Sequence, residues 1–318
     1  MAIKGKQIFL TGGAGFIGTK IIEKLVEDNQ IVVFDNFSRD SLSKEGLINH
    51  KNIKAIKGDI LDLKHVEESM KGSDIVIHLA AIAGVDTVIN NPVKTMRVNV
   101  IGTYNVLESA SKLPKLERFM DFSTSEVFGT YAFKVDEKAS TAQGAVGEAR
   151  WTYSVSKLTG EHFSHAYYNE FKLPTVTVRP FNIYGPGQIG EGAIHHFVKR
   201  AIANEDLVVH GDGSQIRAWC YVDDIVEGIF LALEKPEAIG QAFNIGNTTS
   251  TVTVFDLAER IIRLAKADST ITFKPITYSD IEIRIPNIDK AKELLGYEPK
   301  VNLDEGILRT IDWYKKNL

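Results

Sequence analysis

Short apolar runs alternate with segments of helical periodicity through the first half of the chain. The strand-like runs occupy residues 7–11, 31–34, 53–56, 74–80, 118–123 and 175–178. The segments with apolar residues on one helical face occupy residues 20–28, 96–110 and 153–171. Because parallel strands need crossover connections, this alternation predicts an α/β fold with a doubly wound parallel sheet covered on both faces.

The pattern changes after Pro180, where a glycine-rich stretch predicts more loops than regular elements. Later apolar patterns predict helices at 197–203, 223–233, 254–265 and 304–314, and a strand at 241–245. We expect a first domain over residues 1–180 and a smaller, mainly substrate-binding C-terminal domain over 181–318. A segment of about 218–247 is expected to return to the first domain.

Composition places the chain among ordinary globular proteins, with 318 residues, 44% hydrophobic and 25% charged. Its net charge of −4 does not predict nucleic acid as a partner. The single cysteine, Cys220, cannot form an intrachain disulfide. No apolar run approaches the ~18 residues of a membrane span. We therefore expect a cytoplasmic protein with no membrane partner.

The loop after the first strand carries a phosphate-binding pattern, with Gly12, Gly15 and Gly18 between strand and helix. The first glycine permits a tight turn, the second lets backbone N–H groups approach a pyrophosphate, and the third allows close helix–sheet packing. Asp35 ends the second strand, where a carboxylate accepts hydrogen bonds from the adenosine ribose. This favours NAD over NADP, although the nearby Arg39 could receive a 2′-phosphate.

Further cofactor contacts are expected around these positions. Asp59 follows the third strand, and its carboxylate could reach the adenine amino group or cap a helix. The other residues predicted to contact the cofactor are Phe16, Ile17, Asn36, Ile60, Leu79, Ala80 and Ala81. His78 lies in a predicted core strand and is interpreted as structural or close to the cofactor. His195 and His196 are interpreted as partly exposed polar residues, because the sequence offers no further ligands for a metal site, and no metal is expected.

Tyr153 and Lys157 lie four residues apart, on one face of a predicted helix. A free tyrosine has a pKa of about 10, and a lysine ammonium together with a positive nicotinamide would favour its phenolate. The loop after the fifth strand adds the Thr124 hydroxyl, which can pass a substrate proton to Tyr153. Glu126 adds a carboxylate in the same loop. These four residues are the candidate catalytic group.

Together these motifs resemble those of the extended short-chain dehydrogenases/reductases that act as nucleotide-sugar epimerases, dehydratases and decarboxylases. The resemblance rests on TGGAGFIG at 11–18, HLAA at 78–81, STSEVFG at 123–129, YSVSK at 153–157, RPFNIYGPG at 179–187 and GDGSQIRAWCYVDD at 211–224. One departure is Phe128, where the family usually has tyrosine. The resemblance implies a Rossmann-type domain, tightly bound and recycled NAD, and oxidation of a sugar hydroxyl, usually at C4.

The resemblance also implies residue roles. Tyr153 would be the base, Lys157 its tuner and a ligand of the cofactor ribose, and Thr124 the third catalytic member. Implied contacts to the nucleotide sugar are Thr124, Ser125, Asn182, Arg217 and Arg284, the last on the phosphates or a sugar carboxylate. The family usually forms homodimers through two helices, which correspond to segments 96–111 and 153–171.

The loop Thr124-Ser125-Glu126 bears on which reaction is catalysed. It matches UDP-glucuronate decarboxylases, and the segment RWTYSVSK at 150–157 also resembles the bacterial enzyme of this kind that leaves a 4-keto pentose. A UDP-glucuronate decarboxylase is therefore the best single assignment, whereas simple 4-epimerases usually lack the glutamate. dTDP-glucose 4,6-dehydratases have aspartate where this chain has Ser125. A UDP-sugar 4-epimerase, acting on UDP-glucose, UDP-galactose or UDP-glucuronate, stays open, as does a 4,6-dehydratase. A non-catalytic NAD-sensing protein is a further alternative, but such proteins typically lose the Tyr/Lys pair.

Overall fold

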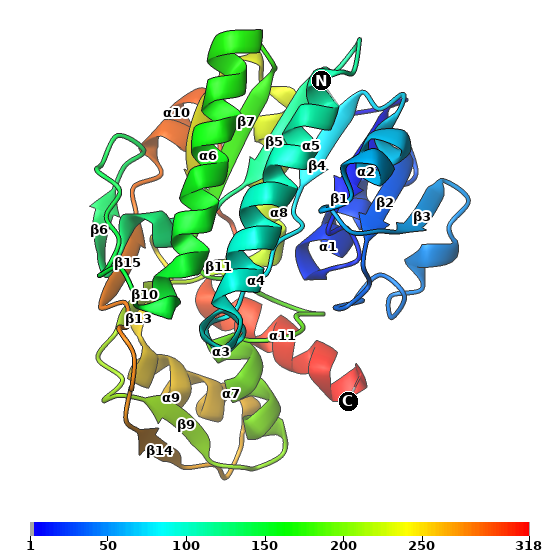
Figure 1. Cartoon of the computed structure of the whole chain (residues 1–318). Coiled ribbons are helices and arrows are strands. Elements are labelled where there is room, and N and C mark those ends of the chain that lie inside the picture. Colours follow the sequence, from blue (N-terminus) through cyan, green and yellow to red (C-terminus); the bar gives the residue numbers. More distant parts are fainter. Residues whose placement is uncertain (1–2, 318) are drawn as a thin grey trace.

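The computed structural model describes residues 3–317, and its centre is a seven-stranded parallel sheet (Figure 1). The strand order is β12-β7-β5-β4-β1-β2-β3, and every neighbouring pair is parallel. The strands are β1 (Gln7–Thr11), β2 (Gln30–Asp35), β3 (Ile53–Lys57), β4 (Ile75–His78), β5 (Arg118–Phe122), β7 (Thr175–Pro180) and β12 (Gln241–Ile245). This confirms the predicted doubly wound sheet.

Helices cover both faces of this sheet, because successive side chains along a strand point to opposite faces and are apolar on both. Ile8 and Leu10 of β1 pack with one group of helices, and Phe9 between them packs with the other. The first group contains α1 (Phe16–Leu25) and α8 (Val222–Glu234). The second contains α2 (Leu63–Met70), α5 (Gly102–Ser111) and α6 (Thr152–Phe171). Because both faces are buried, central strands such as β1, β2 and β4 read as nearly continuous apolar runs.

A second, four-stranded sheet lies beside the first, in the order β13-β10-β15-β6. Its strands are β6 (Tyr131–Val135), β10 (Ile216–Ala218), β13 (Thr251–Thr253) and β15 (Ile283–Pro286). Two strand pairs complete this half: β8 (Ile183–Tyr184) with β11 (Cys220–Tyr221), and β9 (Leu207–His210) with β14 (Ile271–Lys274). Since β6 comes from the first half of the chain and β12 returns to the large sheet, the boundary near residue 180 stays a prediction.

The remaining helices frame the lower half of Figure 1 and the edge of the large sheet. They are α3 (Val85–Asn90), α4 (Pro92–Met96), α7 (Ala193–Ile202), α9 (Val254–Ala265), α10 (Asp289–Leu295) and α11 (Leu303–Asn317). The helix predicted over 96–110 is interrupted: α4 leads into a π-helical turn, Arg97–Ile101, before α5 begins. No helix within residues 3–317 is both long and apolar enough to cross a membrane.

Candidate active site

The turn between β1 and α1 forms a cradle that only glycine permits. Gly12 has a φ of +70°, and a Cβ there would lie 2.6 Å from the backbone nitrogen of Ala80. A Cβ on Gly18 would lie 2.6 Å from the carbonyl oxygen of Gly13. Helix α1 begins directly after Gly15, so its free N–H groups and positive dipole end face this turn. The arrangement fits a pyrophosphate held by backbone N–H groups.

A cavity of about 590 Å³ opens over this turn. Every residue predicted to contact the cofactor from the first half of the large sheet lines it: Gly12, Gly15, Phe16, Ile17, Gly18, Asp35, Asn36, Asp59, Ile60, Leu79, Ala80 and Ala81. Lys94, Gln188 and Glu191 are among the further lining residues that the sequence did not predict. Glu191 accepts hydrogen bonds from the backbone N–H groups of Asp86 and Thr87 at 2.9 and 3.0 Å, which ties the 185–192 loop to α3.

The end of β2 is arranged for a ribose rather than a phosphate. Asp35 accepts hydrogen bonds from the backbone N–H groups of Ala14 and Phe37, at 3.0 and 2.8 Å. Burial raises the pKa of Asp35, and these N–H groups lower it. Arg39 donates to the backbone oxygen of Ala83 at 3.1 Å, so its guanidinium is already engaged. The arrangement fits NAD without a 2′-phosphate.

Three sequence interpretations need correction or completion. The N-cap of α2 is Asp62, which accepts from the His65 backbone N–H, so the capping interpretation of Asp59 was wrong. His78 is fully buried between Thr11 and Thr103 hydroxyls, at 2.7 and 2.9 Å, and burial lowers its pKa to about 3, which makes it structural. His195, expected to be partly exposed, is instead buried and hydrogen-bonded to Tyr314.

The candidate base lies in the first turn of α6, which begins at Thr152. Burial raises the pKa of Tyr153 and the negative Glu126 raises it further, while the Thr124 hydroxyl and two arginines lower it. Burial also lowers the pKa of Lys157, which Asp121 and Glu161 counteract. Tyr153 therefore keeps its proton in this state, and the expected lowering of its pKa depends on the positive cofactor.

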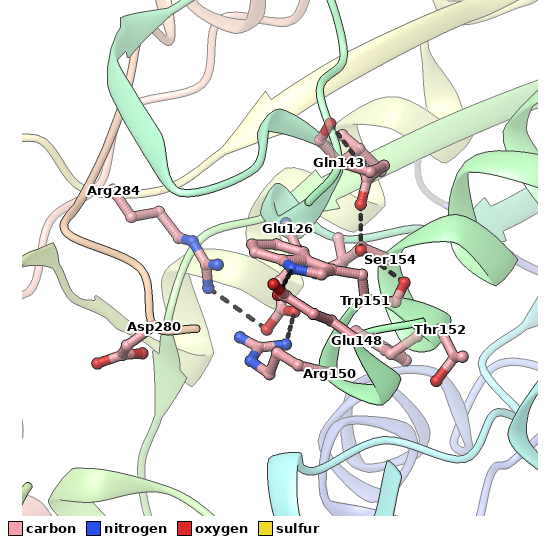
Figure 2. A network of polar contacts seen from close by, with 12 residues as sticks. Glu126, Gln143, Glu148, Arg150, Trp151, Thr152, Ser154, Asp280 and Arg284 are labelled. Atoms are coloured by element: carbon pink, nitrogen blue, oxygen red, sulfur yellow. Dashed lines mark hydrogen bonds and ion pairs between the residues drawn. The ribbon is translucent and has the colours of Figure 1, made fainter. Parts of the chain in front are cut away.

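Glu126 is positioned by the 3-10 helix η3 (Ser125–Phe128), which follows β5 directly. Thr124 caps η3 by accepting from the Glu126 N–H at 3.2 Å. Arg150 Nη1 lies 2.5 Å from Glu126 Oε2, and Arg284 Nη1 lies 3.6 Å from Oε1 (Figure 2). Burial alone would raise the pKa of Glu126, but Arg284 and Arg150 outweigh it and hold the pKa below its ordinary value. Glu126 is therefore a carboxylate at neutral pH.

Arg284, on β15, has a free hydrogen-bonding edge. Its side chain is 7% exposed, and neither Nε nor Nη2 has a hydrogen-bond partner among residues 3–317. These two nitrogens form the edge with which a guanidinium binds a planar carboxylate or a phosphate through two parallel hydrogen bonds. Leaving such buried donors unpaired costs about 1–3 kcal/mol each. The edge therefore has the chemistry of an anion site.

Two other residues predicted to bind the substrate, Arg217 and Asn182, donate hydrogen bonds to backbone oxygens. Arg217 of β10 is the register partner of Arg284, and it donates to Ile281 and Ile216 at 2.5 and 3.0 Å. Burial lowers the pKa of Arg217 to about 10, and the charge of Arg284 contributes to the lowering. Asn182 donates to the oxygen of Ala218 at 2.8 Å. That these residues bind the nucleotide diphosphate stays a prediction, as does the role of Ser125, which is buried in η3.

Arg150 is a charged neighbour of Glu126 to which the sequence analysis assigned no role. It lies in the 3-10 helix η4 (Ala149–Trp151), immediately before α6. The segment from Arg150 to Lys157 resembles that of UDP-glucuronate decarboxylases, but this resemblance does not say what Arg150 contacts. Only the fold brings it to Glu126, 24 positions earlier in the chain.

Comparison with known proteins gives a consistent set of relatives. Residues 8–246 match the model of the NAD dependent epimerase/dehydratase family. The chain is 34% identical to a UDP-N-acetyl-alpha-D-glucosaminuronate decarboxylase of Bacillus cytotoxicus, over 98% of both chains. It is 36% identical to UDP-glucuronic acid decarboxylase 6 of Arabidopsis thaliana, over 95% of this chain and 86% of that protein.

Among solved structures, the fold is similar to that of the UDP-glucuronic acid 4-epimerase from Bacillus cereus, determined in complex with UDP-glucuronic acid and NAD. The TM-score is 0.89 at 30% identity, and the match covers 98% of this chain and all of that one. The two decarboxylases and this epimerase are thus similar to the present chain over nearly its whole length.

Proposed function

The chain belongs to the NAD dependent epimerase/dehydratase family, and on that premise we propose that it decarboxylates a UDP-linked uronic acid, with UDP-glucuronate as the best single substrate. Family and relatives make it an NAD-dependent enzyme that acts on a nucleotide sugar. The observation that supports a uronic acid as the substrate is the unpaired hydrogen-bonding edge of Arg284, which is buried beside Glu126.

A uronic acid supplies the group that this edge lacks. Its C6 carboxylate is planar and carries two acceptor oxygens, which match Nε and Nη2 of Arg284. A neutral sugar, with a hydroxymethyl group at C6, would leave at least one buried donor unpaired, at a cost of about 1–3 kcal/mol. The curated relatives from Bacillus cytotoxicus and Arabidopsis thaliana are named as decarboxylases of such sugars, which supports the same substrate class.

The proposed chemistry assigns a role to each side chain. NAD held over the β1–α1 turn by residues such as Gly12, Gly15 and Asp35 would supply the oxidation at C4 by taking up a hydride. Tyr153 accepts the proton of the C4 hydroxyl, with Thr124 beside it and the Lys157 ammonium stabilising the phenolate. The resulting ketone lies β to the carboxylate, so the C5–C6 bond can break and leave its electron pair in an enolate as carbon dioxide departs. The enolate then takes a proton at C5 from a water oriented by the ionised Glu126, and the proton that Tyr153 took from the C4 hydroxyl replaces the one that this water loses. The products of this sequence are a 4-keto pentose, carbon dioxide and the reduced cofactor.

A second candidate function is 4-epimerisation of UDP-glucuronate. The structural likeness to the Bacillus cereus epimerase favours it, and Arg284 could hold the same carboxylate in that reaction. Glu126 argues against it, because a reaction confined to C4 requires no acid or base at C5. The two functions differ in the mass of their products.

Mass spectrometry of the products separates the candidates. We would incubate the purified protein with NAD and UDP-glucuronate, with Tyr153→Phe as the matched inactive control. Loss of carbon dioxide is the expected result. An unchanged mass with a new retention time would replace the decarboxylase by an epimerase. Loss of water from UDP-glucose or a dTDP-sugar, without turnover of UDP-glucuronate, would indicate a dehydratase.

We also propose a homodimer, formed through the helices that lie side by side in Figure 1, α5 and α6. Ile101 and Tyr104 at this surface are 46% and 41% exposed, and Tyr104 contacts Phe163 of α6. Covering them with a second copy would remove apolar surface from water. Light scattering of wild type and Tyr104→Glu tests this: the variant should be monomeric, and a monomeric wild type would contradict the proposal. The cytoplasmic location likewise stays a proposal.

A further inference from the structure

We propose that Arg150 is a positioning residue that keeps Glu126 off the free edge of Arg284 and so reserves that edge for the carboxylate of the substrate. The inference rests on the proposed uronic acid substrate and deepens it, because it explains how the site would select acidic over neutral sugars.

The geometry shows a carboxylate shared unequally between two arginines. Glu126 Oε2 lies 2.5 Å from Arg150 Nη1, within hydrogen-bond distance. Its other oxygen lies 3.6 Å from Arg284 Nη1, which is an ion pair but too long for a hydrogen bond. Figure 2 shows both guanidinium groups directed at this one carboxylate. Glu126 therefore has its hydrogen bond with Arg150, whereas Arg284 acts on it through charge alone.

The free edge of Arg284 would otherwise be the better partner for Glu126. A two-point guanidinium–carboxylate pair is stronger and more directional than a single long contact. Arg284 Nε and Nη2 are buried without partners among residues 3–317, and Nη1 of the same group already lies beside Glu126. Without Arg150, Glu126 is expected to turn onto this edge and occupy the place of the substrate carboxylate.

Arg150 is itself well anchored for this task. Its guanidinium lies over the Trp151 ring, 5.5 Å from the ring centroid. Trp151 Nε1 donates to Glu148 at 2.9 Å, and Glu148 also accepts from the Ser279 hydroxyl. The Arg150 side chain is 5% exposed. The short helix η4 thus joins the segment before α6 to the loop before β15, and it holds Arg150 in place.

The test compares dissociation constants of UDP-glucuronate and UDP-glucose, which differ in the C6 carboxylate. Calorimetry is done on the NAD-loaded Tyr153→Phe protein, so that bound sugar is not turned over. In this parent, UDP-glucuronate should bind more tightly. Adding Arg150→Met should reduce the preference by about tenfold or more, since an internal carboxylate now competes for Arg284. Affinity for UDP-glucose should change little.

A second substitution makes the inference specific. Adding Glu126→Gln to Arg150→Met removes the competing carboxylate and should restore the preference seen with Glu126→Gln alone. Arg150→Lys keeps a positive charge near Glu126, so this variant should retain most of the preference for UDP-glucuronate over UDP-glucose. If Arg150→Met does not fold, Arg150→Gln takes its place in both comparisons.

The outcomes separate the inference from the proposed function. A parent protein that binds both sugars equally would overturn both. A parent that prefers UDP-glucuronate, with the preference unchanged by Arg150→Met or not restored by Glu126→Gln, would overturn the role of Arg150 alone. Equal weakening of both ligands would show a merely structural role for Arg150, which also overturns it.

Discussion

Replacing Arg284 by methionine should remove activity without reducing stability. The guanidinium is buried, and its Nε and Nη2 have no partner among residues 3–317, so the folded protein gains no hydrogen bonds from that edge. Its charge also lies near Arg217, whose pKa it helps to lower. Methionine fills a similar volume without charge, and Glu126 keeps its 2.5 Å contact with Arg150.

The expected magnitudes follow from the hydrogen bonds that Arg284 would make to the substrate and from those that it does not make in the free protein. Two hydrogen bonds to a substrate carboxylate, at about 1.5–3 kcal/mol each, correspond to a decrease of at least about 10²-fold in kcat/KM for UDP-glucuronate. In the substrate-free protein, removing two unpaired buried donors offsets removal of the 3.6 Å ion pair with Glu126. The free energy of unfolding should therefore be unchanged or higher by up to about 2 kcal/mol.

The assay combines carbon dioxide release, binding of UDP-glucose and thermal unfolding of the NAD-loaded protein. Arg284→Lys is the matched control, because it keeps the charge but not the two-point edge, and it should recover only part of the activity. The reasoning would be refuted if Arg284→Met decarboxylated UDP-glucuronate at the wild-type rate. It would also be refuted if the variant lost several kcal/mol of stability, since the edge would then have a structural partner.

Three further predictions concern buried charges of the site. Burial raises the pKa of Asp121 to about 6, so its ionised form costs about 3 kcal/mol above that pH. At a pH above about 6, Asp121→Asn should therefore have a higher melting temperature than wild type, and at a pH below about 4 the two proteins should melt at the same temperature. An equal increase at both pH values would contradict this prediction. In Glu126→Gln, bound NAD should still be reduced when UDP-glucuronate is added, but the rate of product formation should fall at least about tenfold. An unchanged rate of product formation would show that Glu126 has no catalytic role. The rate of NAD reduction should rise with pH as Tyr153 loses its proton, and Lys157→Met should move this rise to higher pH. An unshifted pH profile would show that Lys157 does not lower the pKa of Tyr153.

The large sheet and the cofactor cradle were predictable because their signals are local. Most of the parallel strands are largely apolar runs, and the glycines of the β1–α1 turn are required by contacts within a few residues or with the neighbouring strand. The chain order of strands and helices then fixes which loops meet at one edge of the sheet. This is why the residues predicted to contact the cofactor from the β1–β4 half of the sheet line one cavity, whereas Tyr153 and Lys157 do not line it.

The second sheet and the arginines around Glu126 were harder to predict because their contacts are distant in sequence. β6 pairs with β15, about 150 positions later, and each strand is too short to carry a clear alternation. Arg150 and Asp121 would ordinarily be read as exposed, since charged side chains are rarely buried without partners. Asp121 lies instead in the middle of the buried strand β5. Burial of such groups is decided by the packing of α6, which local pattern does not reveal.

The most direct test of the account is a crystal structure of the Tyr153→Phe variant with NAD and UDP-glucuronate. In this complex we expect the sugar carboxylate to lie within hydrogen-bond distance of both Nε and Nη2 of Arg284. Glu126 should still be paired with Arg150. A carboxylate bound elsewhere, with the edge of Arg284 on the diphosphate or on Glu126, would contradict the central claim that this arginine selects a uronic acid.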